Sequence, residues 1–258
     1  MEYLYESVQR SYEDYASGRV LYNAHGTTSF PVRLASEIAQ RCFHILEQKG
    51  AGGPYSLYDP CCGGAYLLTV LGLMHGQRFS SVIGSDVNPE VLAIANKNLS
   101  LLTHQGLDHR IGQLQELFER YHKPSHQEAL QSAARLKVLL DRSRLEDASC
   151  YPADITDSQS QAALNRPAGI HMVITDLPYG DIVSWHGGSG EPVREFFEQI
   201  HPMLDPGHSV VAVIADKGQK LRHDRFKRLQ QFKAGKRRWP SWNRYDAGEV
   251  SIPSLHRR

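Results

Sequence analysis

Short apolar runs alternate with amphipathic stretches along most of this chain. Apolar runs of strand length occupy residues 55–58, 82–85, 149–153, 171–175 and 209–215. Apolar side chains recur at helical spacing over residues 31–45, 66–74, 91–102 and 196–204. Runs of strand length that alternate with helical patterns are typical of a parallel sheet covered by helices. The pattern therefore predicts an α/β fold with a mostly parallel sheet and helices on both of its faces.

A long helical segment interrupts this alternation between the second and third predicted strands. Two stretches with apolar stripes, residues 111–121 and 125–140, indicate two helices that are separated by Pro124. Two helices of this length are too small to bury a core of their own. We therefore predict a helical hairpin inserted at about residues 104–147, and not a separate domain.

The two ends of the chain are expected to differ from this central domain. Residues 1–28, with two glycines and five tyrosines, predict an irregular N-terminal extension that contains one short helix. Near the other end we predict a basic helix at 224–231 and one or two edge strands at about 236–245. The central domain, with its helical insertion, is then expected to span residues 29–252. Residues 253–258 are expected to be a disordered tail.

Composition bounds the class of protein. The 258 residues are 41% hydrophobic and 22% charged, which is ordinary for one globular domain. No run of about 18 apolar residues and no secretory signal occur, so we expect a cytoplasmic protein without a membrane partner. The four cysteines are too few and too irregularly spaced for a disulfide framework, and they lack the spacing of a metal site. No metal is therefore predicted, and a monomer is expected.

Positive charge is concentrated near the C-terminal end. Residues 215–244 contain 11 Lys and Arg but 2 Asp, whereas the whole chain has a formal net charge of +1. Aromatic residues are interleaved with these cations, a combination that suits a polyanion such as RNA. A solvated helix face with a charged edge strand is the alternative. The candidate RNA-binding residues are Lys236, Arg237, Arg238 and Trp239.

Acids and small residues gather at the predicted ends of the strands. Asp59 ends the first strand and is followed by a turn with Gly63 and Gly64, Asp86 ends the second strand, and Asp176 ends the fourth. A turn without bulky side chains lets backbone N–H groups approach a ligand, and an acid about 20 residues later can accept the hydroxyls of a ribose. An ordinary connection from strand to helix is the alternative for the turn alone. The combination predicts a nucleoside-cofactor site.

Three of these segments resemble known sequence motifs. Residues 59–65 (Asp-Pro-Cys-Cys-Gly-Gly-Ala), 85–89 (Ser-Asp-Val-Asn-Pro) and 176–179 (Asp-Leu-Pro-Tyr) resemble motifs I, II and IV of Rossmann-like S-adenosylmethionine-dependent methyltransferases. With the string Phe-Pro-Val-Arg-Leu-Ala-Ser-Glu-Ile at 30–38, they resemble the avilamycin-resistance 23S rRNA guanine methyltransferase family over about residues 20–240. One position departs from the usual Gly-x-Gly of motif I, because Ala65 stands in place of the last glycine. Alanine permits this turn unless the position needs a positive φ.

The resemblance implies a seven-stranded type of sheet and S-adenosylmethionine as the cofactor. By position, Gly63 and Gly64 would cradle its amino-acid end, Asp86 its ribose, Asp59 its amino group and Asp154 its adenine. The full set of expected cofactor-binding residues is Arg33, Asp59, Pro60, Cys61, Gly63, Gly64, Asp86, Asp154 and Asp176. Two alternatives stay open, because Arg33 could pair with a surface acid and Asp154 could cap a short helix at 158–164.

The segment Asp176, Leu177, Pro178 and Tyr179 is the candidate catalytic site. The Asp176 carboxylate and a carbonyl near Leu177 or Pro178 can accept hydrogen bonds from a planar nitrogen, and Tyr179 offers a ring on which a base can stack. A loop at 181–190 is expected beside it. The resemblance implies an enzyme that methylates a guanine of 23S rRNA, free or in a ribosomal particle, and that confers resistance to a ribosome-targeting antibiotic. Alternatives are N2-guanine or N6-adenine methylation of another RNA, or a non-catalytic RNA-binding factor.

Overall fold

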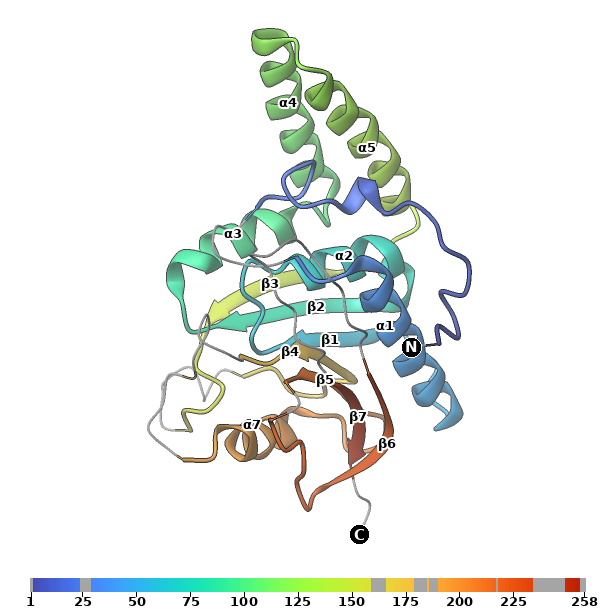
Figure 1. The fold of residues 1–258 in the computed structure, drawn as a ribbon, viewed down its shortest axis with the longest axis vertical. Coiled ribbons are helices and arrows are strands. Elements are labelled where there is room, and N and C mark those ends of the chain that lie inside the picture. The colour runs from blue at the N-terminus through green and yellow to red at the C-terminus, as the bar shows by residue number, and fades with distance from the viewer. Residues whose placement is uncertain are drawn as a thin grey trace.

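The structure is a computed structural model that describes residues 2–23, 29–158, 166–178, 185, 190–216, 218–233 and 249–255. Within these residues, seven strands form one sheet in the order β3-β2-β1-β4-β5-β7-β6 (Figure 1). The strands are β1 (Tyr55–Asp59), β2 (Phe79–Asp86), β3 (Asp147–Pro152), β4 (Met172–Asp176), β5 (Val210–Ala215), β6 (Phe226–Lys233) and β7 (Glu249–Leu255). Strands β1 to β5 are parallel to one another, and β7 is antiparallel to both of its neighbours. This confirms the mostly parallel sheet.

Alternating side chains of the central strands build a separate apolar core on each face of the sheet. On one face Leu57 of β1 packs with the helices α1 (Val32–Gln48), α2 (Tyr66–His75) and α3 (Pro89–Ser100). On the other face Tyr58 of β1 packs with α7 (Pro192–Ile200) and the 3-10 turn His201–Met203. Helices thus cover both faces, as the sequence predicted. The side chain of Asn88 caps α3, because it accepts a hydrogen bond from the N–H of Glu90 at the start of this helix.

The inserted segment forms the helices α4 (His104–Tyr121) and α5 (Pro124–Leu140), which project from the sheet as a hairpin (Figure 1). Helix α4 begins seven residues earlier than predicted, and Thr103 caps it by accepting from the N–H of Gly106. Buried side chains near the base, such as Leu107 and Leu136, join the core under α2. The hairpin therefore extends the main core and does not enclose a core of its own.

The N-terminal segment packs into the domain and is not an appended extension. Val20 and Leu21 are fully buried in the same core as α1 and α2. Burial of two such side chains stabilises a fold by about 1.5–3 kcal/mol each. The expected boundary at residue 29 consequently does not separate two packing units. Residues 1–28 contain no run of strong apolar periodicity, so this packing could not be predicted from the sequence.

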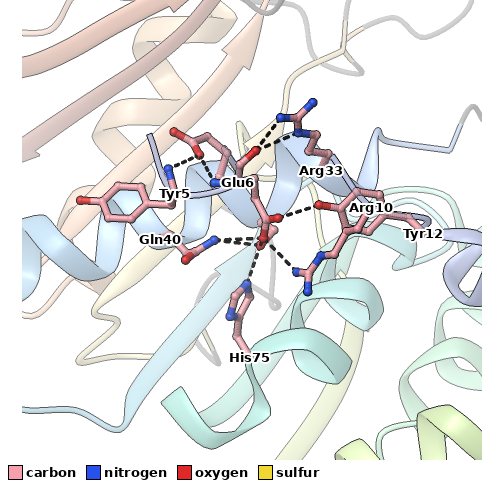
Figure 2. A network of polar contacts seen from close by, with 9 residues as sticks. Tyr5, Glu6, Arg10, Tyr12, Arg33, Gln40 and His75 are labelled. Atoms are coloured by element: carbon pink, nitrogen blue, oxygen red, sulfur yellow. Dashed lines mark hydrogen bonds and ion pairs between the residues drawn. The ribbon is translucent and has the colours of Figure 1, made fainter. Parts of the chain in front are cut away.

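Two buried acids fasten the N-terminal segment to α1. The carboxylate of Glu37 accepts the backbone N–H groups of Leu4, Tyr5 and Glu6 at 2.8, 2.9 and 2.9 Å. The carboxylate of Glu6 accepts hydrogen bonds from Ser36, Gln40, Tyr12 and Arg10 (Figure 2). Because each acid is 6% exposed or less, these bonds compensate the loss of hydration. Tyr12 thus has a structural role.

The C-terminal part differs from the prediction in two places. Residues predicted as a basic helix at 224–231 form the outermost strand β6, and the expected disordered tail contributes to β7, which extends to Leu255. A register shift between Arg228 and Gln230 explains the first difference. It places Phe226 and Phe232 against the cores on opposite faces, although they are six residues apart. A β-bulge of this kind hides the alternation by which a strand is recognised. The predicted loop at 181–190, helix at 158–164 and strands at 236–245 lie largely or wholly outside the described residues.

Candidate active site

Three acids meet at the carboxyl edge of the sheet. Asp59 and Asp176 end the adjacent strands β1 and β4, and Asp86 ends β2 on the other side of β1. Asp59 is 2% exposed, and burial, with the charge of Asp86 contributing, raises its pKa to about 7. The structure therefore brings together the three acids that sequence reasoning placed at strand ends.

The turn after β1 is held by the two acids next to it. The N–H of Cys61 donates to Asp59 Oδ1 at 3.1 Å, and the N–H of Gly63 donates to Asp86 Oδ2 at 2.8 Å. Gly63 has φ +52°, and a side chain added there would meet open space. The turn thus leaves room for a ligand beside Gly63, while Asp86 links it to the next strand.

Ala65 occupies the strained position of this turn. Its φ is +55°, so the condition under which alanine would be unfavourable is met. A left-handed conformation costs a residue other than glycine about 1–2 kcal/mol. Neighbouring bonds hold it, because the N–H of Ala65 donates to the carbonyl of Cys62 at 2.8 Å and the carbonyl of Gly64 accepts from Asn98 Nδ2 at 2.8 Å.

Asn98 was missed by sequence reasoning. It lies on α3 with 1% exposure, and its side chain accepts from the N–H of Tyr22 and donates to the carbonyls of Tyr22 and Gly64. This one amide therefore joins the N-terminal segment to the turn after β1. The signal in the sequence was a polar residue within the apolar spacing of 91–102.

Asp176 has the most perturbed carboxylate of the site. Burial, followed by the charge of Asp59, raises its pKa to about 8. Its Oδ1 is buried, and no described residue forms a hydrogen bond with it. A buried polar atom without a partner is costly and is common at functional sites. The geometry therefore offers an acceptor that a ligand can satisfy.

We expect these two acids to make the free protein less stable as the pH rises. Their folded-state pKa values of about 7 and 8 lie above the value of 3.8 for an ordinary Asp, so the folded state holds protons that the unfolded state has released. The resulting stabilisation is complete below about pH 4 and is lost as the pH rises through 7 to 8. Between pH 6 and 9, we expect the free energy of unfolding of the wild type to fall by about 2 kcal/mol more than that of Asp176→Asn. This figure allows for solvent screening, because Asp176 is partly open to solvent. Urea unfolding of both proteins at the two pH values measures this difference, and equal losses would contradict it.

The segment after Asp176 is only partly described. The N–H of Leu177 donates to the carbonyl of Ile214 on β5 at 2.9 Å, and Leu177 is 1% exposed. The carbonyl of Pro178 accepts from Gln219 Nε2 at 2.9 Å. Of the acceptors expected here, the Pro178 carbonyl is therefore already engaged, whereas Asp176 Oδ1 has no partner among the described residues. Tyr179 lies outside the described residues.

Other candidate residues are engaged elsewhere. Arg33 donates to the carbonyls of Glu6 and Ser7 and lies 4.0 Å from the ring centroid of Tyr3, so it binds the N-terminal segment and not a surface acid. Asp154 lies two residues beyond β3, and its Oδ1 accepts from the N–H and hydroxyl of Thr156 at 2.8 and 2.6 Å. These bonds close a local turn, and the capping alternative stays a prediction because residues 159–164 lie outside the described residues. The candidate RNA-binding residues 236–239 lie outside the described residues.

Nucleophilic and metal-dependent chemistry find no support in the described part of the chain. Burial, followed by the charge of Asp59, raises the pKa of Cys61 and of Cys62 well above the ordinary value, so both remain neutral thiols. No group of three or more potential ligands in the described ranges is placed to hold a metal ion. No described helix is both long and apolar enough to cross a membrane.

Pro60, another expected cofactor-binding residue, is engaged through its backbone. Its carbonyl accepts a hydrogen bond from the Ser85 hydroxyl at 3.4 Å.

A surface cavity of about 210 Å³ lies elsewhere, between the N-terminal segment and α5. Its charged lining residues are paired, Arg10 with Glu6 and Arg135 with Asp14. None of the three acids at the carboxyl edge lines it. The acidic edge, with its turn and its unpartnered carboxylate, is therefore the better candidate for chemistry.

Comparisons with known proteins point to one family. The family model described as rRNA methyltransferase AviRa matches residues 1–237. A 23S rRNA (guanine(2535)-N(1))-methyltransferase from Streptomyces viridochromogenes is 41% identical over 226 residues, which cover 87% of this chain and 88% of that protein. A structure of rRNA methyltransferase AviRa from the same organism at 1.5 Å has a TM-score of 0.81 and 37% identity, with coverage of 98% and 96%. A putative RNA methyltransferase from Pyrococcus horikoshii, at 13% identity, TM-score 0.50 and coverage of 98% and 96%, shares the fold.

Proposed function

Because this chain belongs to the AviRa family of rRNA methyltransferases, we propose that it transfers a methyl group from S-adenosylmethionine to a guanine of 23S ribosomal RNA. The observation that carries this proposal is the half-buried Asp176 carboxylate, whose buried Oδ1 has no described partner, at the end of the strand next to β1. The Streptomyces relative, named for methylation of guanine N1, supports the choice of atom.

The acidic edge fits a cofactor that carries positive charge. S-adenosylmethionine has a sulfonium and an ammonium group, and it supplies an activated methyl group. Asp59, Asp86 and Asp176 lie near the turn that offers open space beside Gly63, and a bound cation would favour the ionised forms of Asp59 and Asp176, whose pKa values are raised in the free protein. We propose that Asp86 accepts the ribose hydroxyls, since each carboxylate oxygen keeps a lone pair beyond its bond to Gly63 or Asn88. Gly63 and Gly64 would hold the amino-acid end.

Asp176 suits a ring nitrogen that must lose a proton. Guanine N1 carries a hydrogen, so its lone pair becomes available for transfer only when a base takes that proton. A carboxylate with a pKa of about 8 is a far stronger base than an ordinary Asp, because its charged form is poorly solvated. We propose that Asp176 accepts this proton while Tyr179 stacks on the base. An exocyclic amine needs a hydrogen-bond acceptor but makes less demand on basicity, so the raised pKa favours N1 over N2 of guanine or N6 of adenine.

The exposed cations of the outer strand are the proposed RNA contact. Lys220, Arg222, Arg225, Lys227 and Arg228 are exposed, lie on or just before β6, and form no ion pair with any described residue. On the hairpin, Arg135 pairs with Asp14 and Lys137 with Asp108, whereas Arg120 and Lys123 form no ion pair with a described residue. Cations without acidic partners can neutralise phosphates. Between the two surfaces we favour β6 because it is continuous in sequence with the candidates at 236–239.

Neutralising Lys227 and Arg228 to Gln together should weaken rRNA binding by about 10-fold at low salt and lower the salt slope of log Kd by about 1.5, close to one counterion for each lost phosphate contact. The matched control neutralises Arg135 and Lys137 to Gln on the hairpin. Filter binding over a range of salt concentrations measures all three proteins. The same affinity and slope in the β6 variant and the wild type would exclude β6 as the contact.

The direct test of the proposed activity is transfer of labelled methyl from S-adenosylmethionine to 23S rRNA by the purified chain. Incorporation into rRNA is expected, with cofactor and RNA both required. Cofactor-independent RNA binding without transfer would instead favour the non-catalytic factor considered from the sequence.

A further inference from the structure

Gln219 makes a contact that links the end of β5 to the candidate catalytic segment. Its Nε2 donates to the carbonyl of Pro178 at 2.9 Å, and its Oε1 accepts from the N–H of Asp216 at 3.0 Å. The orientation of the amide is fixed by chemistry, because a backbone N–H requires the oxygen and a carbonyl requires the nitrogen. The side chain therefore bridges two backbones that are 38 residues or more apart in sequence.

The turn that carries Gln219 is itself well held. The N–H of Gln219 donates to the carbonyl of Asp216 at 3.0 Å, and the N–H of Gly218 donates to Asp216 Oδ1 at 2.7 Å. Gln219 is half-buried, so its bonds are partly protected from competing water. Its amide is thus presented to Pro178 by a small, internally bonded turn.

The segment between Asp176 and Pro178 is fixed at both ends by β5 and this turn. At one end Asp176 pairs with Ile214 in the sheet, and the N–H of Leu177 donates to the carbonyl of Ile214. At the other end Gln219 holds the carbonyl of Pro178. Without Gln219, the described contacts would leave the Pro178 carbonyl free to rotate, and the peptide that leads to Tyr179 would rotate with it.

We propose that Gln219 is a positioning residue for methyl transfer, which fixes the Pro178 carbonyl and thereby holds Asp176, two residues earlier, in the reactive arrangement with the guanine. This inference rests on the proposed function. It assigns a role to a residue whose described side-chain hydrogen bonds go to Asp216 and Pro178, and not to the three acids or the turn after β1. Misplacement of reacting groups by about 1 Å can reduce a rate by about 10²-fold, so one such bond can matter for chemistry without affecting binding.

The test is the variant Gln219→Glu, which keeps the acceptor for Asp216 and replaces the donor to Pro178 by a charged oxygen. We expect single-turnover methyl transfer to fall about 10-fold or more. The dissociation constants for S-adenosylmethionine and rRNA should stay within about 2-fold, and the melting temperature should be nearly unchanged. Gln219→Met, which removes both bonds without adding charge, should show the same separation.

Gln115→Glu is the matched control, because the exposed Gln115 on α4 also donates its amide, in this case to Glu119 Oε1. It should transfer methyl at the wild-type rate. A wild-type rate in both Gln219 variants would overturn the inference. A loss of rate would also overturn it if the affinity for S-adenosylmethionine fell by the same factor and the melting temperature fell as well. Failure of the wild-type chain itself to methylate rRNA would be a different result, since it would remove the proposed function.

Discussion

Asp176→Asn is expected to reduce methyl transfer to 23S rRNA by about 10²-fold or more while leaving the affinity for S-adenosylmethionine nearly unchanged. The amide has the shape of the carboxylate but cannot take the proton of guanine N1. Asp176 has an unpartnered Oδ1 and a pKa of about 8, so it can accept the proton of guanine N1. Its replacement should therefore slow the chemical step and not weaken binding. Single-turnover transfer of labelled methyl, with separate titrations of cofactor and RNA, measures each contribution.

A control variant distinguishes this effect from general loss of structure. Asp141→Asn at the C-terminal end of α5 changes an exposed acid remote in sequence from the site, and it should retain full activity. The Asp176→Asn variant should also be more stable than the wild type at pH 8, because it removes a poorly solvated charge whose buried Oδ1 lacks a partner among the described residues. Full activity in Asp176→Asn would mean that this segment is only a turn after β4.

Asp86→Ala is expected to weaken S-adenosylmethionine binding by about 10²-fold, which corresponds to roughly 2.7 kcal/mol. Two losses contribute: the proposed acceptor for the ribose hydroxyls and the acceptor that holds the N–H of Gly63 at 2.8 Å. Calorimetric titration of the wild type and the variant measures the change.

Asp86→Asn separates the two contributions. Its amide keeps one oxygen as an acceptor but places an NH2 group against the N–H of either Gly63 or Asn88, both of which now donate to the carboxylate. We expect an affinity between those of the wild type and Asp86→Ala. Wild-type affinity in both variants would remove Asp86 from the cofactor site.

The elements that the sequence predicted correctly are those with an uninterrupted pattern. The fully apolar β5 and the amphipathic α1 carry a periodicity that burial alone enforces. Strand β6 was mistaken for a helix because a register shift near Arg228 reverses the alternation halfway along it. The packing of residues 2–23 was missed because buried acids such as Glu37, which look like surface residues in a sequence, hold this segment.

The candidate site was predicted where strand ends determine it and missed where long-range side-chain contacts do. Asp59, Asp86 and Asp176 follow directly from where parallel strands end. Asn98 and Gln219 reach the same segments from 34 and 41 residues away, and no local pattern marks such contacts. The positive φ of Ala65 was likewise not predictable, because the residue type alone does not show which backbone conformation the turn imposes at this position.

Mass mapping of nucleosides in 23S rRNA tests the central claim most directly. Unmodified rRNA is treated with S-adenosylmethionine and either the wild-type chain or Asp176→Asn, digested to nucleosides and analysed by fragmentation that distinguishes methyl positions on the base. We expect the wild type to produce N1-methylguanine at one position and Asp176→Asn to leave the rRNA almost unmodified. Methyl groups on adenine or on guanine N2, or the same yield of N1-methylguanine from both proteins, would contradict the account.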